Sequence, residues 1–237
     1  MKTIFYPETL DFIAENAFMN SKVWFEEHKD KYKKYVQEPL VALSQYVAPA
    51  VEDIDPHIIT LPRNTVSRIY RDARFAKGSL YRDMLWVSFR RDKKCFQAWP
   101  EFYFIISPGT FFYGCGYYCT KTPVMAEIRK MVASDHPMYI RARDVLMANE
   151  EIVIDGEMYK RSRYPHYSED KRIWLDRKTI RFTVFPSGKQ LFSPDLAEQV
   201  RQTFLAMRPI YDLLVYAEEQ AVLAEEDTNK QQFFDKL

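Results

Sequence analysis

The chain has 237 residues, of which 47% are hydrophobic and 16% aromatic, so it can bury a large core and does not have the composition of a disordered protein. Its 6 glycines form neither the pattern GxxxxGK nor the pattern GxGxxG, which excludes nucleotide-binding loops of these two types. The net charge of +1 combines +7 over residues 63–94 (ten Lys or Arg, three Asp), +5 over residues 158–181 (eight Lys or Arg, three Asp or Glu) and −11 elsewhere.

The N-terminus lacks the apolar stretch of a secretory signal peptide, and no run approaches the ~18 apolar residues of a membrane span. We therefore expect a cytoplasmic protein that does not enter a membrane. The three cysteines, Cys95, Cys115 and Cys119, make an odd number and form no CxxC pair. In a reducing compartment we expect free thiols, with no disulfide, no bound metal and no cofactor.

The first 52 residues have the pattern of helices. Residues 7–18 place apolar side chains at helical spacing. Asn20 or Ser21 offers the N-cap of a second helix, and Pro39 ends or kinks that helix and can begin the next. Residues 53–64 have the composition of a connector. The apolar stripe of the second helix consists of Trp24, His28, Tyr32, Tyr35 and Val36.

The middle of the chain changes to the pattern of strands. Residues 85–89 alternate, and residues 102–106 and 110–117 are aromatic and β-branched runs separated by a Ser-Pro-Gly turn. We expect two strands in a hairpin within an antiparallel sheet. Gly114 and Gly116 indicate a bulge or a close backbone approach in the second strand.

The last part of the chain alternates between the two patterns. It predicts helices over residues 124–132, 137–147 and 170–175, and strands over residues 152–154 and 179–185. Ser193 and Pro194 form an N-cap and first-position pair for a long last helix, which Pro209 can kink.

This order of elements is typical of an α+β fold. We expect a central, mostly antiparallel sheet with a helical N-terminal segment and a long C-terminal helix. No repeat, low-complexity tract or linker divides the sequence. We therefore expect a single domain over residues 1–237, with a flexible end after about residue 224.

The run from Arg68 to Tyr81 interleaves cations with aromatic residues. Each arginine carries five donors on a permanently charged planar fork, so several together repel one another unless an anion or carboxylates lie among them. Asp72 is the natural internal counter-charge and can hold one arginine through a bidentate contact. The candidate ligand-binding residues of this run are Arg68, Arg71, Asp72, Arg74, Lys77 and Tyr81.

Two interpretations of this run stay open. In one, it forms a pocket for phosphate, carboxylate or a nucleic-acid backbone. In the other, it is a structural network of salt bridges with acids from the helices. If residues 68–71 are extended, their side chains alternate, so that Arg68 and Tyr70 lie on one side and Ile69 and Arg71 on the other.

A second segment, from Tyr159 to Tyr167, also pairs basic and aromatic residues. A surface that follows phosphates and stacks on bases requires this combination. Lys160 and Arg161 are its candidate ligand-binding residues. The alternatives are a solvated basic loop and a protein–protein contact, since Tyr and Arg are common at the centres of such interfaces.

Catalytic residues stay unassigned. The sequence contains no GxSxG nucleophile elbow and no HxH or HExxH metal pattern. His28 is a candidate acid–base group because imidazole titrates near neutral pH, although its aromatic stripe is more typical of a core.

The core Arg68-x-x-Arg71-Asp72-x-Arg74-Phe75 resembles the signature of the DUF2461 family, a group of uncharacterised bacterial proteins. Two further blocks are similar to the family: one runs from Asn20 to Tyr32, and the other is Tyr159-Lys160-Arg161 ahead of Leu175 and Lys178. The resemblance spans roughly residues 8–220. It implies a shared fold and a shared basic site, and it implies no particular reaction.

The chain departs from the family pattern after Phe75. The Asp/Asn-Lys pair of the family is missing, and the spacing to Tyr81 is shorter. Either Lys77 replaces the missing lysine, or the ligand chemistry of the site is altered in this chain.

These observations favour a module that binds an anionic ligand, phosphorylated or carboxylate, or nucleic acid. Its basic cleft would be built by residues 68–81 with help from residues 160–167, and we expect Arg68, Arg71 and Arg74 to converge there with Lys160. The alternatives are an enzyme that acts on such a ligand and a protein–protein interaction domain with structural arginines.

Overall fold

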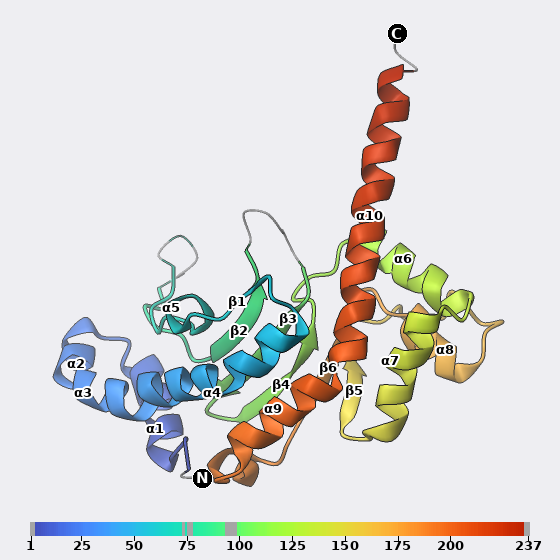
Figure 1. The fold of residues 1–237 in the computed structure, drawn as a ribbon. Coiled ribbons are helices and arrows are strands. Elements are labelled where there is room, and N and C mark those ends of the chain that lie inside the picture. Colours follow the sequence, from blue (N-terminus) through green and yellow to red (C-terminus); the bar gives the residue numbers. More distant parts are fainter. Residues whose placement is uncertain (1–2, 73, 75–77, 93–98, 235–237) are drawn as a thin grey trace. The chain divides into compact units, whose positions relative to one another are not determined.

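The computed structural model of the chain describes the backbone of residues 3–72, 74, 78–92 and 99–234, and side chains as far as residue 225 (Figure 1). The chain divides into two compact units. The first unit consists of Met1–Asp92, Phe102–Gly114 and Val184–Leu205, and the second of Lys93–Glu101, Cys115–Thr183 and Ala206–Leu237. The expected single domain over the whole chain stays a prediction.

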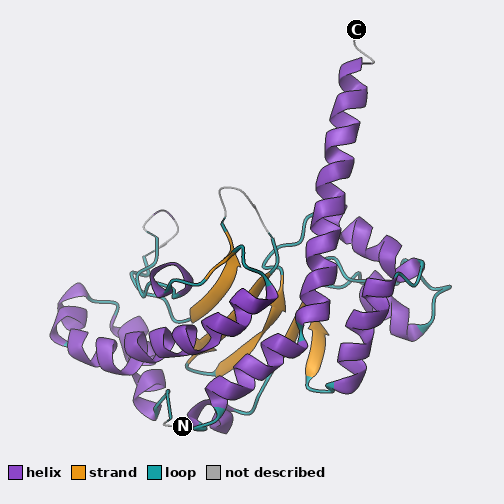
Figure 2. Cartoon of the chain, viewed as in Figure 1, coloured by secondary structure: helices purple, strands orange, loops and turns teal. Residues whose placement is uncertain are grey.

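Within the residues that the structure describes, six strands form a sheet in the order β1-β2-β3-β4-β6-β5, and helices lie before, between and after them in the chain. Figure 2 distinguishes the strands, in orange, from the helices, in purple. This arrangement confirms the predicted α+β class and the antiparallel sheet. The strands are β1 Ile58–Ile59, β2 Leu85–Arg91, β3 Glu101–Ser107, β4 Thr110–Gly116, β5 Ile152–Asp155 and β6 Arg181–Val184. Each predicted strand is present, and β1 lies within the segment expected to be a connector.

The register of β2 and β3 explains why their sequences predicted paired strands. The two strands pair antiparallel from Leu85↔Ile106 to Phe89↔Phe102. All four of these side chains are buried. Since full burial of such a side chain contributes about 1.5–3 kcal/mol, a slip of one residue would expose this set and is strongly disfavoured.

The first unit begins with the predicted helices. They are α1 Pro7–Met19, α2 Lys22–Glu27, α3 Lys29–Tyr32, the π-helical turn η1 Lys33–Gln37, α4 Glu38–Ile54 and α5 Pro62–Thr65. Ser21 caps α2, since its side chain accepts a hydrogen bond from the Trp24 amide at 3.3 Å. Asn20, the other predicted cap, instead ends α1 in the left-handed conformation, with φ 45°. Pro39 lies in the first turn of α4, directly after the π-helical turn η1, and the backbone stays helical across this junction.

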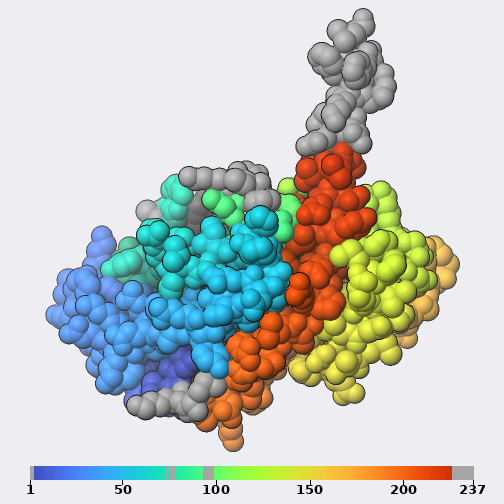
Figure 3. Space-filling model, in the orientation of Figure 1, coloured from blue at the N-terminus to red at the C-terminus, as the bar shows by residue number. Residues whose placement is uncertain are grey.

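Helix α4 supplies much of the core of the first unit. Leu40, Leu43, Val47 and Val51 recur on its buried face. The helix packs against β2 and α5. In the space-filling view, the segment from α2 to α4 forms one continuous outer surface of this unit (Figure 3).

The predicted last helix is two helices. Gly188–Phe192 is a 3-10 turn (η3), α9 spans Leu196–Ala206, and α10 spans Arg208–Phe234. The prediction that Ser193 and Pro194 begin the helix is wrong by two residues. The Ser193 hydroxyl instead accepts a hydrogen bond from the Asp195 amide at 3.2 Å and so holds a turn ahead of α9. The predicted kink at Pro209 is a break, because Pro209 lies in the first turn of α10.

The second unit packs α10 against α6 Thr122–Ala133 and α7 Pro137–Ala148, and α6 against α8 Glu169–Leu175. Helices α6, α7 and α8 match the predicted ones to within two residues at each end. The ring of Trp174 lies edge-on to Tyr139, with centroids 5.3 Å apart, and 5.1 Å from that of Phe182. Trp174 and Phe182 are fully buried, so they anchor the core of this unit.

The predicted close backbone approach is present at Gly116. A Cβ atom placed there would lie 2.4 Å from the Cα of Arg181, and the residue has φ 149°, which side-chain-bearing residues rarely adopt. Nearby, Cys115 is buried and Cys119 is exposed, and both are free thiols. Cys95 lies outside the described residues. No helix in the described part of the chain is long and apolar enough to cross a membrane.

Candidate functional site

The predicted ligand-binding run forms a narrow loop with two antiparallel arms in the first unit. We call residues 68–83 the arginine loop. The Arg71 amide donates to the Leu80 carbonyl at 2.9 Å, and the Arg82 amide donates to the Ile69 carbonyl at 2.8 Å. The arms thus pair like two short strands, with Tyr70 opposite Tyr81. Lys77 and Phe75 lie outside the described residues.

Asn20 fastens the second arm of the arginine loop to the corner between α1 and α2. Its side-chain amide donates to the Gly78 carbonyl at 2.8 Å, and its side-chain oxygen accepts from the Leu80 amide at 2.6 Å. These bonds join residues 58 and 60 positions apart in the sequence. The block from Asn20 to Tyr32 and the arginine run are therefore two parts of one local structure.

Asp72 and Arg74 form the internal ion pair that the sequence suggested. The Arg74 guanidinium donates from Nε at 3.0 Å and from Nη2 at 2.6 Å, one bond to each carboxylate oxygen of Asp72. The Arg74 amide adds a bond at 3.0 Å. These hydrogen bonds lower the pKa of the Asp72 carboxyl to about 2.

Arg71 is held by the opposite arm of the arginine loop. Its Nε donates to the Tyr81 carbonyl at 2.8 Å, and its Nη2 donates to Asp83 at 2.6 Å. About a third of the Arg71 side chain stays exposed. Arg71 is therefore fixed in place and still open to a ligand on one side.

Arg82 is a member of the site that the sequence reasoning missed. Its Nε is buried and has no hydrogen-bond partner. Its guanidinium carbon lies 4.7 Å from the centre of the Trp86 ring. Burial, and secondly the positive charge of Arg71, lower the pKa of Arg82, while the Asp72 charge acts in the opposite sense.

The two ends of the loop differ in exposure. Arg68 is exposed, and no described residue pairs with it. Tyr81 is fully buried, its ring stacks on Phe25 with centroids 5.2 Å apart, and its hydroxyl lies 3.5 Å from the Ser21 carbonyl. Burial, and then Tyr70, raise the pKa of Tyr81 to about 12. Tyr81 thus supports the loop, and Tyr70 presents the exposed ring.

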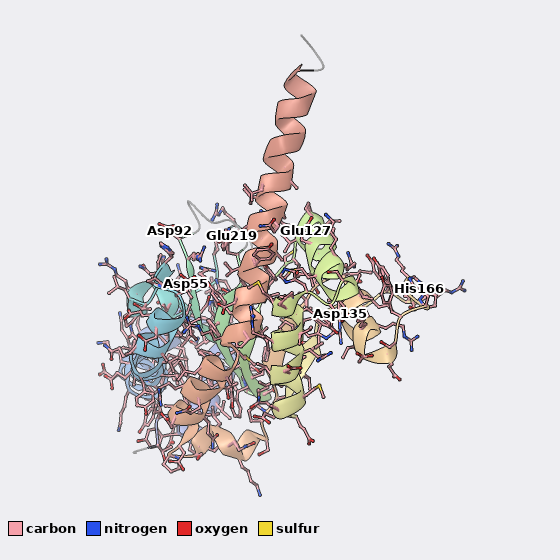
Figure 4. The ribbon with its side chains drawn as sticks, turned by 45° about the vertical axis from the view of Figure 1, so that its right-hand side comes forward. Asp55, Asp92, Glu127, Asp135, His166 and Glu219 are labelled. Carbon is pink, nitrogen blue, oxygen red and sulfur yellow. The ribbon has the colours of Figure 1, made fainter. Side chains whose placement is uncertain are left out.

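Lys160 and Arg161 lie in the second unit, and both are exposed. They belong to an irregular segment, residues 158–168, that we call the basic loop. Figure 4 shows His166 at the outer end of this loop. The convergence of Lys160 with Arg68, Arg71 and Arg74 stays a prediction.

The other candidate groups have structural partners. The Nδ1 of His28 lies 2.8 Å from the Trp24 carbonyl, and its ring stacks on the Trp24 indole with centroids 4.1 Å apart. In the described part of the chain, no three His, Cys, Asp or Glu side chains are grouped so that they could hold a metal ion.

Residues 8–213 match a family model described as "Conserved hypothetical protein (DUF2461)". The chain belongs to the DUF2461 family. The match confirms the resemblance stated from the arginine run. It covers both the arginine loop and the basic loop and ends within the first turns of α10. Among curated proteins, none matches the chain.

For this DUF2461 chain, the sequence located the arginine loop and missed Arg82, Asp83 and the role of Asn20. Arg82 directly follows Tyr81, where the family signature ends. A pairing of the two arms would have placed it opposite Ile69. The hydrogen bonds of Asn20 had no signal in one sequence, because they join distant residues.

Proposed function

We propose that the arginine loop of this DUF2461 protein binds a small oxyanion, such as the phosphate or carboxylate group of a metabolite. The observation that carries the proposal is the state of Arg82. The Arg82 guanidinium is partly removed from water, has one N–H without an acceptor and faces a second arginine. This arrangement is unfavourable by itself. A bound oxyanion would supply the missing acceptor and reverse the repulsion.

The charge balance of the loop supports the same proposal. Its described residues include four arginines and two carboxylates: Arg68, Arg71, Arg74 and Arg82, with Asp72 and Asp83. Each carboxylate already holds one arginine, since Asp72 binds Arg74 and Asp83 binds Arg71. A structural network of salt bridges explains these two pairs, but it leaves Arg68 and Arg82 without a carboxylate partner among the described residues.

Calorimetric titration with inorganic phosphate and with acetate at low ionic strength tests the proposal. Arg82→Gln removes the charge and keeps a side chain that can lie against Trp86. Losing a charge-assisted hydrogen bond costs about 1.5–3 kcal/mol, so phosphate should bind this variant roughly 10–150-fold more weakly.

Arg201→Ala is the matched control in the same unit, because Arg201 is already paired with Glu198 at 2.7 Å. This variant should bind phosphate as the wild type does. The proposal fails if the folded wild type binds neither anion, or if Arg82→Gln binds phosphate as tightly as Arg201→Ala.

A further inference from the structure

The basic loop of the second unit is irregular, yet its backbone is held in place. The amide of Arg163 donates to a carboxylate oxygen of Asp176 at 2.9 Å, and the amide of Tyr159 donates to the Asp176 carbonyl at 2.9 Å. Asp176 is buried. Its negative charge therefore helps to fix the loop backbone instead of forming a surface ion pair. A loop fixed in this way presents its side chains in a defined arrangement.

Tyr159 is surrounded by cations. The guanidinium carbon of Arg163 lies 3.9 Å from the centre of the Tyr159 ring, and that of Arg129 lies 5.6 Å away. Arg129 also donates to the carbonyls of Leu175 at 3.0 Å and Arg177 at 2.5 Å. Arg129 is thus tied to backbone oxygens, and its charge adds to the potential around the tyrosine.

The cations of the basic loop have no carboxylates to neutralise them. Residues 158–168 contain three Lys or Arg and no Asp or Glu. Lys160, Arg161 and Arg163 are exposed, and no described carboxylate side chain forms an ion pair with them. The neighbouring Lys178, by contrast, is paired with Glu157. An unpaired cationic surface of this kind attracts polyanions.

Three rings lie together on the same loop. The ring centroids of Tyr164 and Tyr167 are 6.3 Å apart, and those of His166 and Tyr167 are 4.5 Å apart. His166 is exposed and lies at the outer end of the loop (Figure 4). Since every base has a π face, such a ring cluster can stack with bases of any sequence.

We propose that the basic loop is a binding surface for single-stranded nucleic acid. The strand's phosphates would contact Lys160, Arg161 and Arg163, and its unpaired bases would stack on His166 and the two tyrosines beside it. A duplex keeps its bases stacked inside, and a phosphopeptide brings charge without bases, so neither would use both parts of the surface. This surface lies in the second unit, and the proposal is independent of oxyanion binding at the arginine loop.

Fluorescence anisotropy with a labelled twelve-nucleotide oligo(dT) tests the charge part of the proposal. With three phosphates contacted, the logarithm of the association constant should fall with the logarithm of salt with a slope of about −2. The double variant Lys160→Ala, Arg161→Ala should reduce this slope by more than half. Arg143→Ala is the control on α7, because Arg143 is paired with Asp144 at 3.0 Å and should leave binding unchanged.

The stacking part is tested with His166→Ala, whose exposed side chain can be removed with little effect on folding, and with an abasic oligonucleotide of equal length. Loss of one base-stacking contact should weaken oligo(dT) binding about 5–150-fold. The abasic strand should bind the wild type and the variant equally weakly. The proposal is overturned if oligo(dT) does not bind at low salt. It is equally overturned if the abasic strand, a duplex or a phosphopeptide binds as tightly as oligo(dT), or if the double variant binds oligo(dT) like the control.

Discussion

At the scale of single residues, the pair of Asp72 and Arg74 gives a direct test of the loop geometry. The pKa of the Asp72 carboxyl is lowered to about 2 by hydrogen bonds from Arg74. The pKa of Asp72 in the folded protein is below its ordinary value. Any contribution of the pair to stability is therefore fully present when the pH is above the ordinary pKa, and it is lost as the pH falls toward about 2. A carbon-13 NMR titration should find this low pKa. Arg74→Ala removes the guanidinium and keeps the backbone amide bond of residue 74, so it should raise the pKa of Asp72 part of the way toward the ordinary value. An unchanged titration would show that the side-chain pair does not form in solution.

Glu218 provides the opposite case, in the second unit. This carboxyl is buried, one of its oxygens has no partner, and Lys121 lies 3.4 Å away. Burial raises the pKa of Glu218, and the charge of Lys121 with hydrogen bonds from Lys121 and the Tyr117 hydroxyl only partly offset this. The protonated form is thus favoured in the folded state, so this residue's contribution to stability falls as the pH rises through the raised pKa.

Glu218→Gln should therefore gain stability relative to the wild type as the pH rises from about 4 to 8. Urea denaturation over this range measures the difference. Glu219→Gln, at the exposed neighbouring position on α10, is the control and should follow the wild type. If the two variants behave alike at every pH, Glu218 does not carry the buried charge inferred here.

At the scale of elements, the sequence predicted what is encoded locally. Aromatic and β-branched runs marked β3 and β4, and apolar residues at helical spacing marked α6 and α7, because these patterns act over a few residues. The contacts that complete the site act over longer distances. The Arg82 amide pairs with Ile69 on the opposite arm, and Asn20 reaches Gly78 and Leu80 from the left-handed end of α1.

The Asn20 contacts predict separate effects of two substitutions. Asn20→Gly keeps a residue that tolerates φ 45° and removes two hydrogen bonds, so it should destabilise the first unit by about 1–3 kcal/mol. Asn20→Ala should cost about 1–2 kcal/mol more, because alanine is strained in this conformation. Denaturation measures both, and hydrogen exchange of the Leu80 amide should speed up in each variant. Equal stabilities of the two variants would show that the backbone at Asn20 is not left-handed.

Gly116 allows a similar test at the end of β4. Gly116→Ala would force a Cβ atom against the Arg181 backbone, and overpacking of this kind costs about 1–3 kcal/mol or more. Gly109→Ala, in the turn between β3 and β4, meets nothing within 4 Å and should change stability by less than about 1 kcal/mol. A tolerated Gly116→Ala would mean that β4 does not approach Arg181 as described.

At the scale of the whole molecule, positive charge is concentrated in both units. The arginine loop belongs to the first unit and the basic loop to the second. In the arginine loop, carboxylates hold Arg71 and Arg74, and the buried Nε–H of Arg82 has no acceptor. This arrangement suits a compact oxyanion. The basic loop exposes unpaired cations beside rings, which suits an extended strand. Phosphate and oligo(dT) are therefore expected to respond to different substitutions in the same full-length chain.

Thermal unfolding of the full chain tests oxyanion binding by its effect on stability. A ligand that binds only the folded state at ten times its dissociation constant adds about 1.4 kcal/mol, which raises the midpoint by about 3–6 °C in a chain of this size. Phosphate also stabilises proteins without a site, because it is excluded from their surface. The informative quantity is thus the rise in wild type minus the rise in Arg82→Gln, with Arg201→Ala matching the wild type. If phosphate raises all three midpoints equally, its effect is general and the arginine loop binds no oxyanion.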